Sequence, residues 1–337
     1  MIYRIFGNTD LKVSAIGMGC SGIGKSLHHR NDKESIETLR EAFEAGINFY
    51  DTAPNYSNGD SERLIGKALK NNRDKIIIAS KAGIKFTTVG KIAKSVKPFL
   101  NPVKTLLGPA QSKLPNLYRT QRQNDFSKEF IIKTVEESLK RLQTDYIDLL
   151  MLHHPTNQIL ESGDFCESFE LLKSQGKIRF YGVSCDSIEH AQISLKLSGV
   201  SAIQIELNIL DQEAITKVLP IAFKYKIGII ARLPLAKGLL TDQSSNTKAE
   251  RWAYDWELFE ERKNKAEMFK FLVKENRTMA QSALKFLLQL NEVSVTLIGF
   301  NNRIYLQENI KAISAPNFTH EELEKISGRS SRIDLHG

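Results

Sequence analysis

Residues 127–152, SKEFIIKTVEESLKRLQTDYIDLLML, place an amphipathic segment directly before a short apolar run. The first part, Ser127–Leu142, begins with a serine that can cap a helix and has Glu129 and Phe130 behind it. The second part, Ile147–Leu152, is rich in Ile and Leu, as a strand buried on both faces should be. The stretch therefore predicts a helix followed by a buried strand.

The same alternation recurs along the chain. Seven further apolar runs resemble strands, namely Ala15–Met18, Ile47–Tyr50, Ile76–Ala79, Ile178–Val183, Ala202–Ile205, Ile227–Ala231 and Ser294–Ile298. Three further helix-like stretches are Asp32–Ala45, Asp211–Tyr225 and Met279–Leu290. Alternating strands and helices predict a parallel sheet, and eight repeats favour closure into one (β/α)₈ TIM barrel domain spanning residues 1–337. An open doubly wound sheet is the alternative.

Two segments interrupt the alternation and predict long loops at the C-terminal face of the barrel. They are residues 84–126, after the third strand, and residues 240–265, after the seventh. Long loops inside a compact domain are usually functional or mobile.

Composition excludes several classes of protein. No run of about 18 apolar residues occurs, so we expect no integral membrane segment. The N-terminus lacks a continuous apolar signal region, which favours a cytoplasmic protein. The three cysteines, Cys20, Cys166 and Cys185, form no C-x-x-C pair, so neither a disulfide framework nor a zinc site is expected.

The net charge of +8 is concentrated in one segment. Residues 75–124 carry ten Lys or Arg residues and no Asp or Glu. A nucleic-acid binder usually spreads its basic face more widely and shows a reading motif, so we expect no nucleic-acid partner.

Three interpretations of residues 84–126 remain open. Apolar residues recur there at near-helical spacing, interrupted by Pro98 and Pro102, among eight of the ten basic residues. A short amphipathic helix on the barrel rim with a solvated lysine face accounts for this pattern. A membrane-surface helix is the second interpretation. A basic lid that attracts an anionic ligand to the active-site face is the third.

A glycine motif near the N-terminus is misleading. Gly17-Met-Gly19-Cys-Ser-Gly22 matches the dinucleotide fingerprint G-x-G-x-x-G. A true fingerprint opens directly into a helix, whereas here the polar run Lys25–Asn31 delays the helix to about Asp32. We therefore expect these glycines to let the backbone approach a ligand at the end of the first strand.

Polar residues stand where three successive apolar strands stop. Asp51 closes the second strand, Lys81 the third and His153 the fourth, while Tyr56 follows Asp51 by five positions. The C-terminal strand ends of a (β/α)₈ barrel lie on one face, where active sites are built. Each residue alone has a structural explanation, but together they predict a catalytic site.

The chemistry of these four residues is coherent. Tyrosine has an ordinary pKa near 10 and is a poor acid, and a lysine cation beside the phenol lowers that pKa. Asp51 can hold Lys81, and His153 can orient or polarise a carbonyl. This assembly can deliver a proton to a carbonyl oxygen, but the hydride must come from a cofactor.

The motifs around these residues resemble the aldo-keto reductase family. Residues 51–66, DTAPNYSNGDSERLIG, resemble its segment D-T-A-x-x-Y-G-x-x-E-x-x-x-G. Ala79-Ser-Lys81 and Leu152-His153-His154-Pro155 resemble its T-K and L-H-x-P motifs. The resemblance implies a catalytic tetrad in which His153, and not His154, takes part. Its members are Asp51, Tyr56, Lys81 and His153.

The resemblance also implies a nicotinamide cofactor site. The implied residues are Gly19, Cys20, Asp51, Ser184, Cys185, Gln204, Arg232, Leu233, Leu235, Gly238, Gly299, Asn301, Arg303, Glu308 and Asn309. Cys185 replaces the family's carboxamide-holding asparagine, and Arg232 replaces a tyrosine that stacks on the nicotinamide. Asn301 stands where a basic residue is common, and Arg303 can compensate. We expect NADP(H) to be preferred and NAD(H) to be possible.

The function that follows is NAD(P)H-dependent reduction of an aldehyde or ketone, including sugar-type carbonyls, with Tyr56 as general acid. The alternatives are a redox-sensing subunit, like the potassium-channel β-subunits of this family, and an unrelated barrel lyase or metalloenzyme. Adjacent strand residues point to opposite faces, so His153 and His154 are not expected to share a metal. The expected partner is a small carbonyl substrate, neutral or anionic, and the expected state a monomer or small homo-oligomer.

Overall fold

Eight parallel strands close into a barrel in the computed structural model, which describes residues 1–24, 31–86, 122–242, 256–299 and 303–327. The strands follow the circular order β10-β11-β12-β3-β4-β5-β8-β9. Their bounds are β3 (Ile16–Gly19), β4 (Phe49–Asp51), β5 (Ile77–Ala82), β8 (Ile147–His153), β9 (Ile178–Ser184), β10 (Val200–Glu206), β11 (Gly228–Arg232) and β12 (Val293–Gly299). The predicted TIM barrel is confirmed, and the open sheet is excluded.

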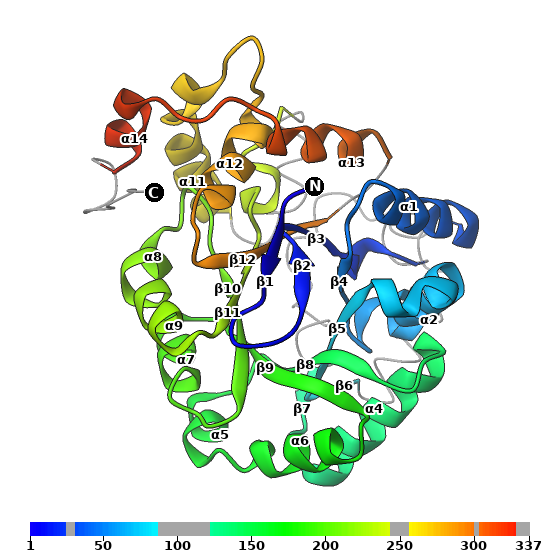
Figure 1. Cartoon of the computed structure of the whole chain (residues 1–337). Helices are drawn as coiled ribbons and strands as arrows, with labels where there is room; N and C mark the ends of the chain where they lie inside the picture. Colours follow the sequence, from blue (N-terminus) through cyan, green and yellow to red (C-terminus); the bar gives the residue numbers. More distant parts are fainter. Residues whose placement is uncertain (25–30, 87–121, 243–255, 300–302, 328–337) are drawn as a thin grey trace, which may run out of the picture.

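Helices surround the barrel on its outside (Figure 1). They are α1 (Asp32–Glu44), α2 (Asp60–Leu69), α4 (Lys128–Leu142), α5 (Asn157–Ser162), α6 (Phe165–Ser174), α7 (Ile188–Ser194), α8 (Glu213–Lys217), α9 (Leu219–Tyr225), α11 (Trp256–Glu267), α12 (Met279–Leu288), α13 (Arg303–Ile310) and α14 (His320–Ser327). Ser127 caps α4 as predicted, because its hydroxyl accepts a hydrogen bond from the Phe130 amide.

One predicted helix is wrong in its length. The stretch Asp211–Tyr225 forms two short helices, α8 and α9, instead of one. Val218 between them leaves the helical region, with φ −121°. Pro220 then lies in the first turn of α9, where its missing amide hydrogen has no cost, whereas inside a continuous helix it would remove a hydrogen bond.

A hairpin that the sequence patterns did not predict packs against the barrel interior. Strands β1 (Tyr3–Ile5) and β2 (Lys12–Ser14) pair antiparallel and lie across the barrel in Figure 1. Phe6, Leu11 and Val13 join a buried cluster with strand residues that include Phe49 and Leu149. These strand residues lie toward the N-terminal parts of β4 and β8, so the hairpin covers that end of the barrel. The C-terminal strand ends are left for the site.

Parts of both predicted long loops lie outside the described residues. Strands β6 (Ile84–Phe86) and β7 (Arg122–Asn124) pair antiparallel, so both ends of the 84–126 segment lie just beyond β5. The helix, lid and membrane-surface interpretations concern residues 87–121, which lie outside the described residues, and they stay predictions. In the second segment, residues 243–255 also lie outside the description. Residues 256–265, predicted as part of this loop, belong to helix α11, so the loop prediction is wrong there.

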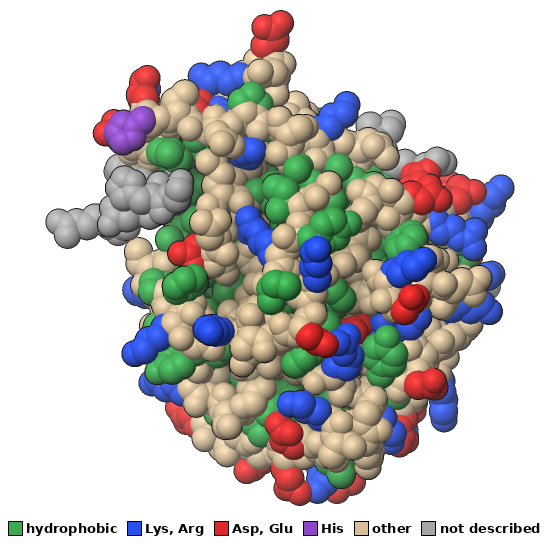
Figure 2. Space-filling view, viewed as in Figure 1, with side chains coloured by type: hydrophobic (Ala, Val, Ile, Leu, Met, Phe, Trp, Pro, Cys, Tyr) green, Lys and Arg blue, Asp and Glu red, His purple; other side chains and the backbone are tan. Residues whose placement is uncertain are grey.

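The surface of the hairpin-bearing face has no single sign of charge. Lys and Arg side chains are interspersed there with Asp and Glu (Figure 2).

All three cysteines are free thiols, as expected. Across the part of the chain that the structure describes, every helix is too short or too polar to cross a membrane.

Candidate active site

The barrel brings the four predicted catalytic residues to one end. Asp51 is the last residue of β4, Lys81 the penultimate residue of β5 and His153 the last residue of β8. Tyr56 begins the short 3₁₀ helix η2 (Tyr56–Gly59) that follows β4. The rings of Tyr56 and His153 lie 6.2 Å apart between centroids in an edge-to-face arrangement. The side chains converge because parallel strands end on the same face.

Lys81 is the centre of the hydrogen-bond network. Its side chain is buried, and its ammonium donates to Asp51 Oδ1 at 2.7 Å, to the Thr52 carbonyl at 2.9 Å and to the Tyr56 hydroxyl at 3.3 Å. An ammonium has three donor hydrogens, so all three have acceptors. Asp51 therefore holds Lys81 against the Tyr56 hydroxyl, as the residue pattern predicted.

The balance of burial and charge at Tyr56 differs from the expectation. Burial raises the pKa of the Tyr56 phenol, while the charge and hydrogen bond of Lys81 lower it. Burial has the larger effect, and the net pKa lies above the ordinary value of 10. Lys81 thus lowers the pKa of Tyr56 as expected, but the sequence-based expectation did not include the larger, opposite effect of burial. The phenol keeps its proton at neutral pH, as a proton donor must.

Burial and neighbouring charges also set the ionisation state of Lys81. Burial lowers the pKa of Lys81, but the Asp51 carboxylate and Tyr56 raise it, and the net pKa lies above the ordinary value. Lys81 is therefore an ammonium at neutral pH. A buried cation beside the phenol will stabilise any negative charge that develops on its oxygen.

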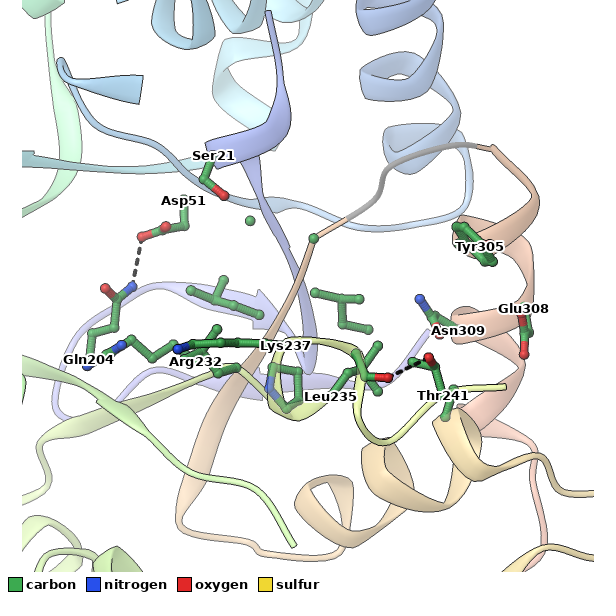
Figure 3. Close-up of a pocket in the computed structure, with 18 of the residues that line it drawn as sticks. Ser21, Asp51, Gln204, Arg232, Leu235, Lys237, Thr241, Tyr305, Glu308 and Asn309 are labelled. Atoms are coloured by element: carbon green, nitrogen blue, oxygen red, sulfur yellow. Dashed lines mark hydrogen bonds between the residues drawn. The ribbon is translucent and has the colours of Figure 1, made fainter. Parts of the chain in front are cut away.

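A second chain of hydrogen bonds joins this network to β9 and β10. Gln204 donates through Nε2 to Asp51 Oδ1 at 2.8 Å, a contact drawn in Figure 3. Ser184 in turn donates to Gln204 Oε1 at 2.7 Å. All three side chains are buried. The network therefore fixes the Gln204 amide, which the sequence assigned to the cofactor, beside the Asp51 carboxylate.

A cleft of about 460 Å³ opens beside these residues (Figure 3). Tyr56 lies at its wall, together with ten residues that the sequence assigned to the cofactor. These are Gly19, Asp51, Gln204, Arg232, Leu233, Leu235, Gly238, Gly299, Glu308 and Asn309. The cleft runs from the tetrad to α13, which supplies Glu308 and Asn309 at the far side.

Other predicted cofactor residues lie differently. The Cys20 thiol is buried and donates to the Met18 carbonyl, and the buried Cys185 thiol lies 3.9 Å from the Ser194 hydroxyl. Burial raises the pKa of Cys185 to about 12. Both thiols therefore point into the protein core, and neither Cys20 nor Cys185 lines the cleft. Ser184 does not line the cleft, and it is connected to the cleft through its hydrogen bond to Gln204.

The two residues expected to select the cofactor phosphate are not placed. Asn301 lies outside the described residues. Arg303 begins α13, but its side chain is outside the description.

The sequence reading missed several residues of the cleft. They are Ser21, Pro234, Lys237, Thr241, Asp242, Ala280, Leu297, Ile298 and Tyr305. Most of them flank motifs already recognised at the ends of β3, β11 and β12, so extending those motifs by a few residues finds them. Tyr305 lies on α13 between the predicted residues Arg303 and Glu308, whereas Ala280 comes from α12, and only the fold brings it to the cleft.

The cleft fits an elongated polar ligand. Leu233, Ala236 and Lys237 all adopt positive φ after β11, and such strained backbone is typical of ligand sites. Among the described residues, apart from the chain neighbours of Gly299, no atom lies within 4 Å of the position that a Cβ on Gly299 would occupy. Arg232 Nε is buried and has no hydrogen-bond partner among the described residues. These features suit a dinucleotide whose reactive end lies beside Tyr56.

The two adjacent histidines do not separate as expected. His154 adopts φ +54° just after β8 ends, so the strand alternation no longer applies. Its ring lies 4.5 Å from the His153 ring between centroids, at 31°. The expected opposite orientation is therefore wrong. Even so, the described residues contain no group of three or more His, Cys, Asp or Glu side chains that could hold a metal ion.

Comparison with known proteins is consistent across sequence and structure. The model of the "Aldo/keto reductase family" matches residues 15–329. The "Uncharacterized oxidoreductase YqkF" of Bacillus subtilis is 30% identical, over 98% of this chain and 96% of its own length. The "L-galactose dehydrogenase" of Arabidopsis thaliana is 28% identical, over 92% and 88%.

A solved structure extends the likeness to the fold. The holo form of the aldo-keto reductase AKR11C1 from Bacillus halodurans superimposes with a TM-score of 0.76 at 28% identity, over 97% of this chain and 96% of that one. The family model matches nearly the whole sequence, in agreement with the barrel fold and with the cluster of Asp51, Tyr56, Lys81 and His153 at the C-terminal end of the barrel. The chain belongs to the aldo/keto reductase family.

Proposed function

We propose that this protein reduces an aldehyde or ketone to an alcohol with NADPH or NADH, with Tyr56 as the proton donor. The observation that carries the proposal is the chain from the Tyr56 hydroxyl to Lys81 Nζ at 3.3 Å and on to Asp51 at 2.7 Å, at the wall of the cleft. The bound cofactor supplies the hydride, which no side chain can provide.

Each residue then has a separate task. The Tyr56 hydroxyl donates its proton to the carbonyl oxygen as that oxygen gains negative charge. Lys81 stabilises the phenolate left behind, and Asp51 positions Lys81. His153, whose ring packs beside Tyr56, orients the carbonyl for this transfer.

The cofactor is held, in this proposal, along the cleft. Gln204 presents its amide beside Asp51, and Arg232 lines the cleft from the end of β11. We further propose that NADPH is preferred over NADH, with Arg303 as the cation that binds the additional phosphate. Its support is the position of Arg303 at the start of α13, the helix that carries Glu308 and Asn309 in the cleft wall.

The substrate class is proposed from two observations. The Arabidopsis relative is named for a sugar, which favours a sugar-type carbonyl. The basic residues of 84–126 favour an anionic substrate, because their segment begins and ends beside β5. The kcat/KM for an anionic substrate should then fall with rising salt concentration more steeply than the kcat/KM for a neutral aldehyde. Replacement of Lys91, Lys94 and Lys97 by Gln should weaken that salt dependence.

The direct experiment is a panel of carbonyl substrates assayed with NADPH and with NADH. Turnover that disappears in Tyr56→Phe supports the reductase. Tight cofactor binding with slow turnover on every substrate would instead favour the redox-sensing subunit. The cytoplasmic location, the single domain and the monomeric or small oligomeric state stay predictions, and gel filtration with light scattering tests the last.

A further inference from the structure

Three polar side chains from three strand ends form a row beside the tetrad. His154 follows β8, Asp186 follows β9 and Arg232 ends β11. His154 Nδ1 lies 2.6 Å from Asp186 Oδ1, and Arg232 donates to the same oxygen at 3.3 Å. None of these side chains belongs to the tetrad, and the proposed mechanism gives Asp186 and His154 no task.

The row reaches the tetrad through the His154 ring. This ring lies 4.5 Å from the His153 ring between centroids, and His153 meets Tyr56 edge-to-face at 6.2 Å. The His154 amide donates to the Ser184 carbonyl at 3.1 Å, which fixes its backbone at positive φ. Positive φ is costly for a residue other than glycine, and such strain collects at functional sites.

Arg232 anchors the other end of the row. Besides Asp186, it donates to the Cys185 carbonyl at 3.0 Å, so it holds the backbone of the segment that carries Asp186. Since Arg232 also lines the cleft, the row connects the cleft wall to the ring beside His153. The described contacts therefore run from Arg232 through Asp186 and His154 to His153.

We propose that Asp186 is a positioning residue for carbonyl reduction. It holds the His154 ring against His153 and thereby fixes the His153 imidazole relative to Tyr56. This inference rests on the proposed reductase function and adds to it a residue that does not touch the reacting atoms.

The charge of Asp186 supports this task. Burial raises the pKa of its carboxyl, but His154 and Arg232 lower it, and the net pKa lies below the ordinary value. The carboxylate is therefore ionised at neutral pH. An ionised carboxylate accepts the hydrogen bond from Arg232 more strongly than a neutral carboxyl would, and His154 Nδ1 lies 2.6 Å from the same oxygen.

A purely structural role makes a different prediction. The Asp186 side chain is 52% exposed, and exposed ion pairs contribute little to stability. If Asp186 formed only an exposed ion pair, its replacement would change neither the free energy of unfolding nor the rate of carbonyl reduction. If it positions His153, stability should change little while the chemical step slows, because small misplacements of catalytic groups are costly.

The test compares Asp186→Asn with Glu189→Gln, which makes the same change from acid to amide three residues away. For a neutral aldehyde, the single-turnover rate of cofactor oxidation and kcat should fall about tenfold or more in Asp186→Asn and stay unchanged in Glu189→Gln. The Kd of the reduced cofactor, measured by fluorescence, and the Tm should change little in both variants.

A double-mutant cycle tests whether Asp186 acts through His154. His154→Phe keeps an aromatic ring against His153 but removes the contact with Asp186. Adding Asp186→Asn to His154→Phe should produce little further loss of rate.

Two negative outcomes are distinct. Wild-type protein that reduces no carbonyl compound with either cofactor overturns the proposed function. An active wild type whose Asp186→Asn variant matches Glu189→Gln in single-turnover rate, or full additivity in the cycle, overturns the positioning role alone.

Discussion

Replacing Tyr56 by phenylalanine removes one oxygen from the centre of the site. The structure gives separate expectations for its effect on stability and its effect on the reaction rate. The Tyr56 hydroxyl lies 3.3 Å from Lys81 Nζ, longer than the usual hydrogen bond of about 2.9 Å. Lys81 keeps its closer partners, Asp51 at 2.7 Å and the Thr52 carbonyl at 2.9 Å. The loss of unfolding free energy should therefore stay within about 1 kcal/mol.

The effect on the rate should be much larger. General acid catalysis commonly contributes roughly 10²- to 10⁴-fold, which corresponds to about 2.7–5.4 kcal/mol of activation free energy. The single-turnover rate and kcat for a neutral aldehyde should fall by that factor in Tyr56→Phe. The Kd of the reduced cofactor, from fluorescence titration, should stay near that of the wild type.

Tyr3→Phe is the matched control. The Tyr3 hydroxyl also makes one hydrogen bond, to the Gly46 carbonyl at 2.9 Å, but on the hairpin away from the cleft. This variant should keep full activity. Near-normal single-turnover rate in Tyr56→Phe, with cofactor bound, would refute the assignment of Tyr56 as the acid.

Four further predictions follow from the same geometry. Lys81→Met leaves the buried Asp51 carboxylate without its cation, so the unfolding free energy should fall by about 3–5 kcal/mol in denaturant titration, and an unchanged value would contradict the ion pair. Because only the protonated phenol of Tyr56 is active and burial raises its pKa, kcat for reduction should stay constant across neutral pH and fall only above about pH 10; a fall near pH 8 would contradict this. Arg303→Ala should reduce the preference for NADPH over NADH in fluorescence titrations, and an unchanged affinity ratio would exclude Arg303 as the phosphate ligand. Gly66→Ala should lower the Tm, although alanine favours helices, because its Cβ would lie 2.4 Å from a backbone carbonyl oxygen at the end of α4; a rise in Tm would show that α4 can move.

Patterns of short range were enough to predict the barrel. Strands such as Ile147–Leu152 are buried on both faces, so their apolar runs can be recognised without knowledge of their neighbours. The division of Asp211–Tyr225 into two helices was missed because a proline has two possible meanings in a helical pattern. Pro220 can begin a new helix or interrupt an existing one, and the sequence pattern alone does not distinguish these cases. The N-terminal hairpin was missed because its strands are only three residues each, too short to show alternation.

The convergence of the four proposed catalytic residues was also predictable. Asp51, Lys81 and His153 are polar residues at the ends of apolar strands, and the topology of a parallel barrel places such ends together. Tyr56 follows on the same loop as Asp51. The cleft was predictable in part, since most of its residues lie at or just after the ends of β3, β10, β11 and β12, whereas Ala280 comes from helix α12.

By itself the sequence determined the barrel and the convergence of the tetrad, because both follow from periodicity and from the position of residues along strands. Only the tertiary structure decided three features of the site. Burial outweighs the Lys81 charge and raises the pKa of Tyr56, the Cys185 thiol faces Ser194 in the core, and positive φ turns His154 onto His153. Each depends on what packs around the side chain in three dimensions, and no pattern of neighbours along the chain records that.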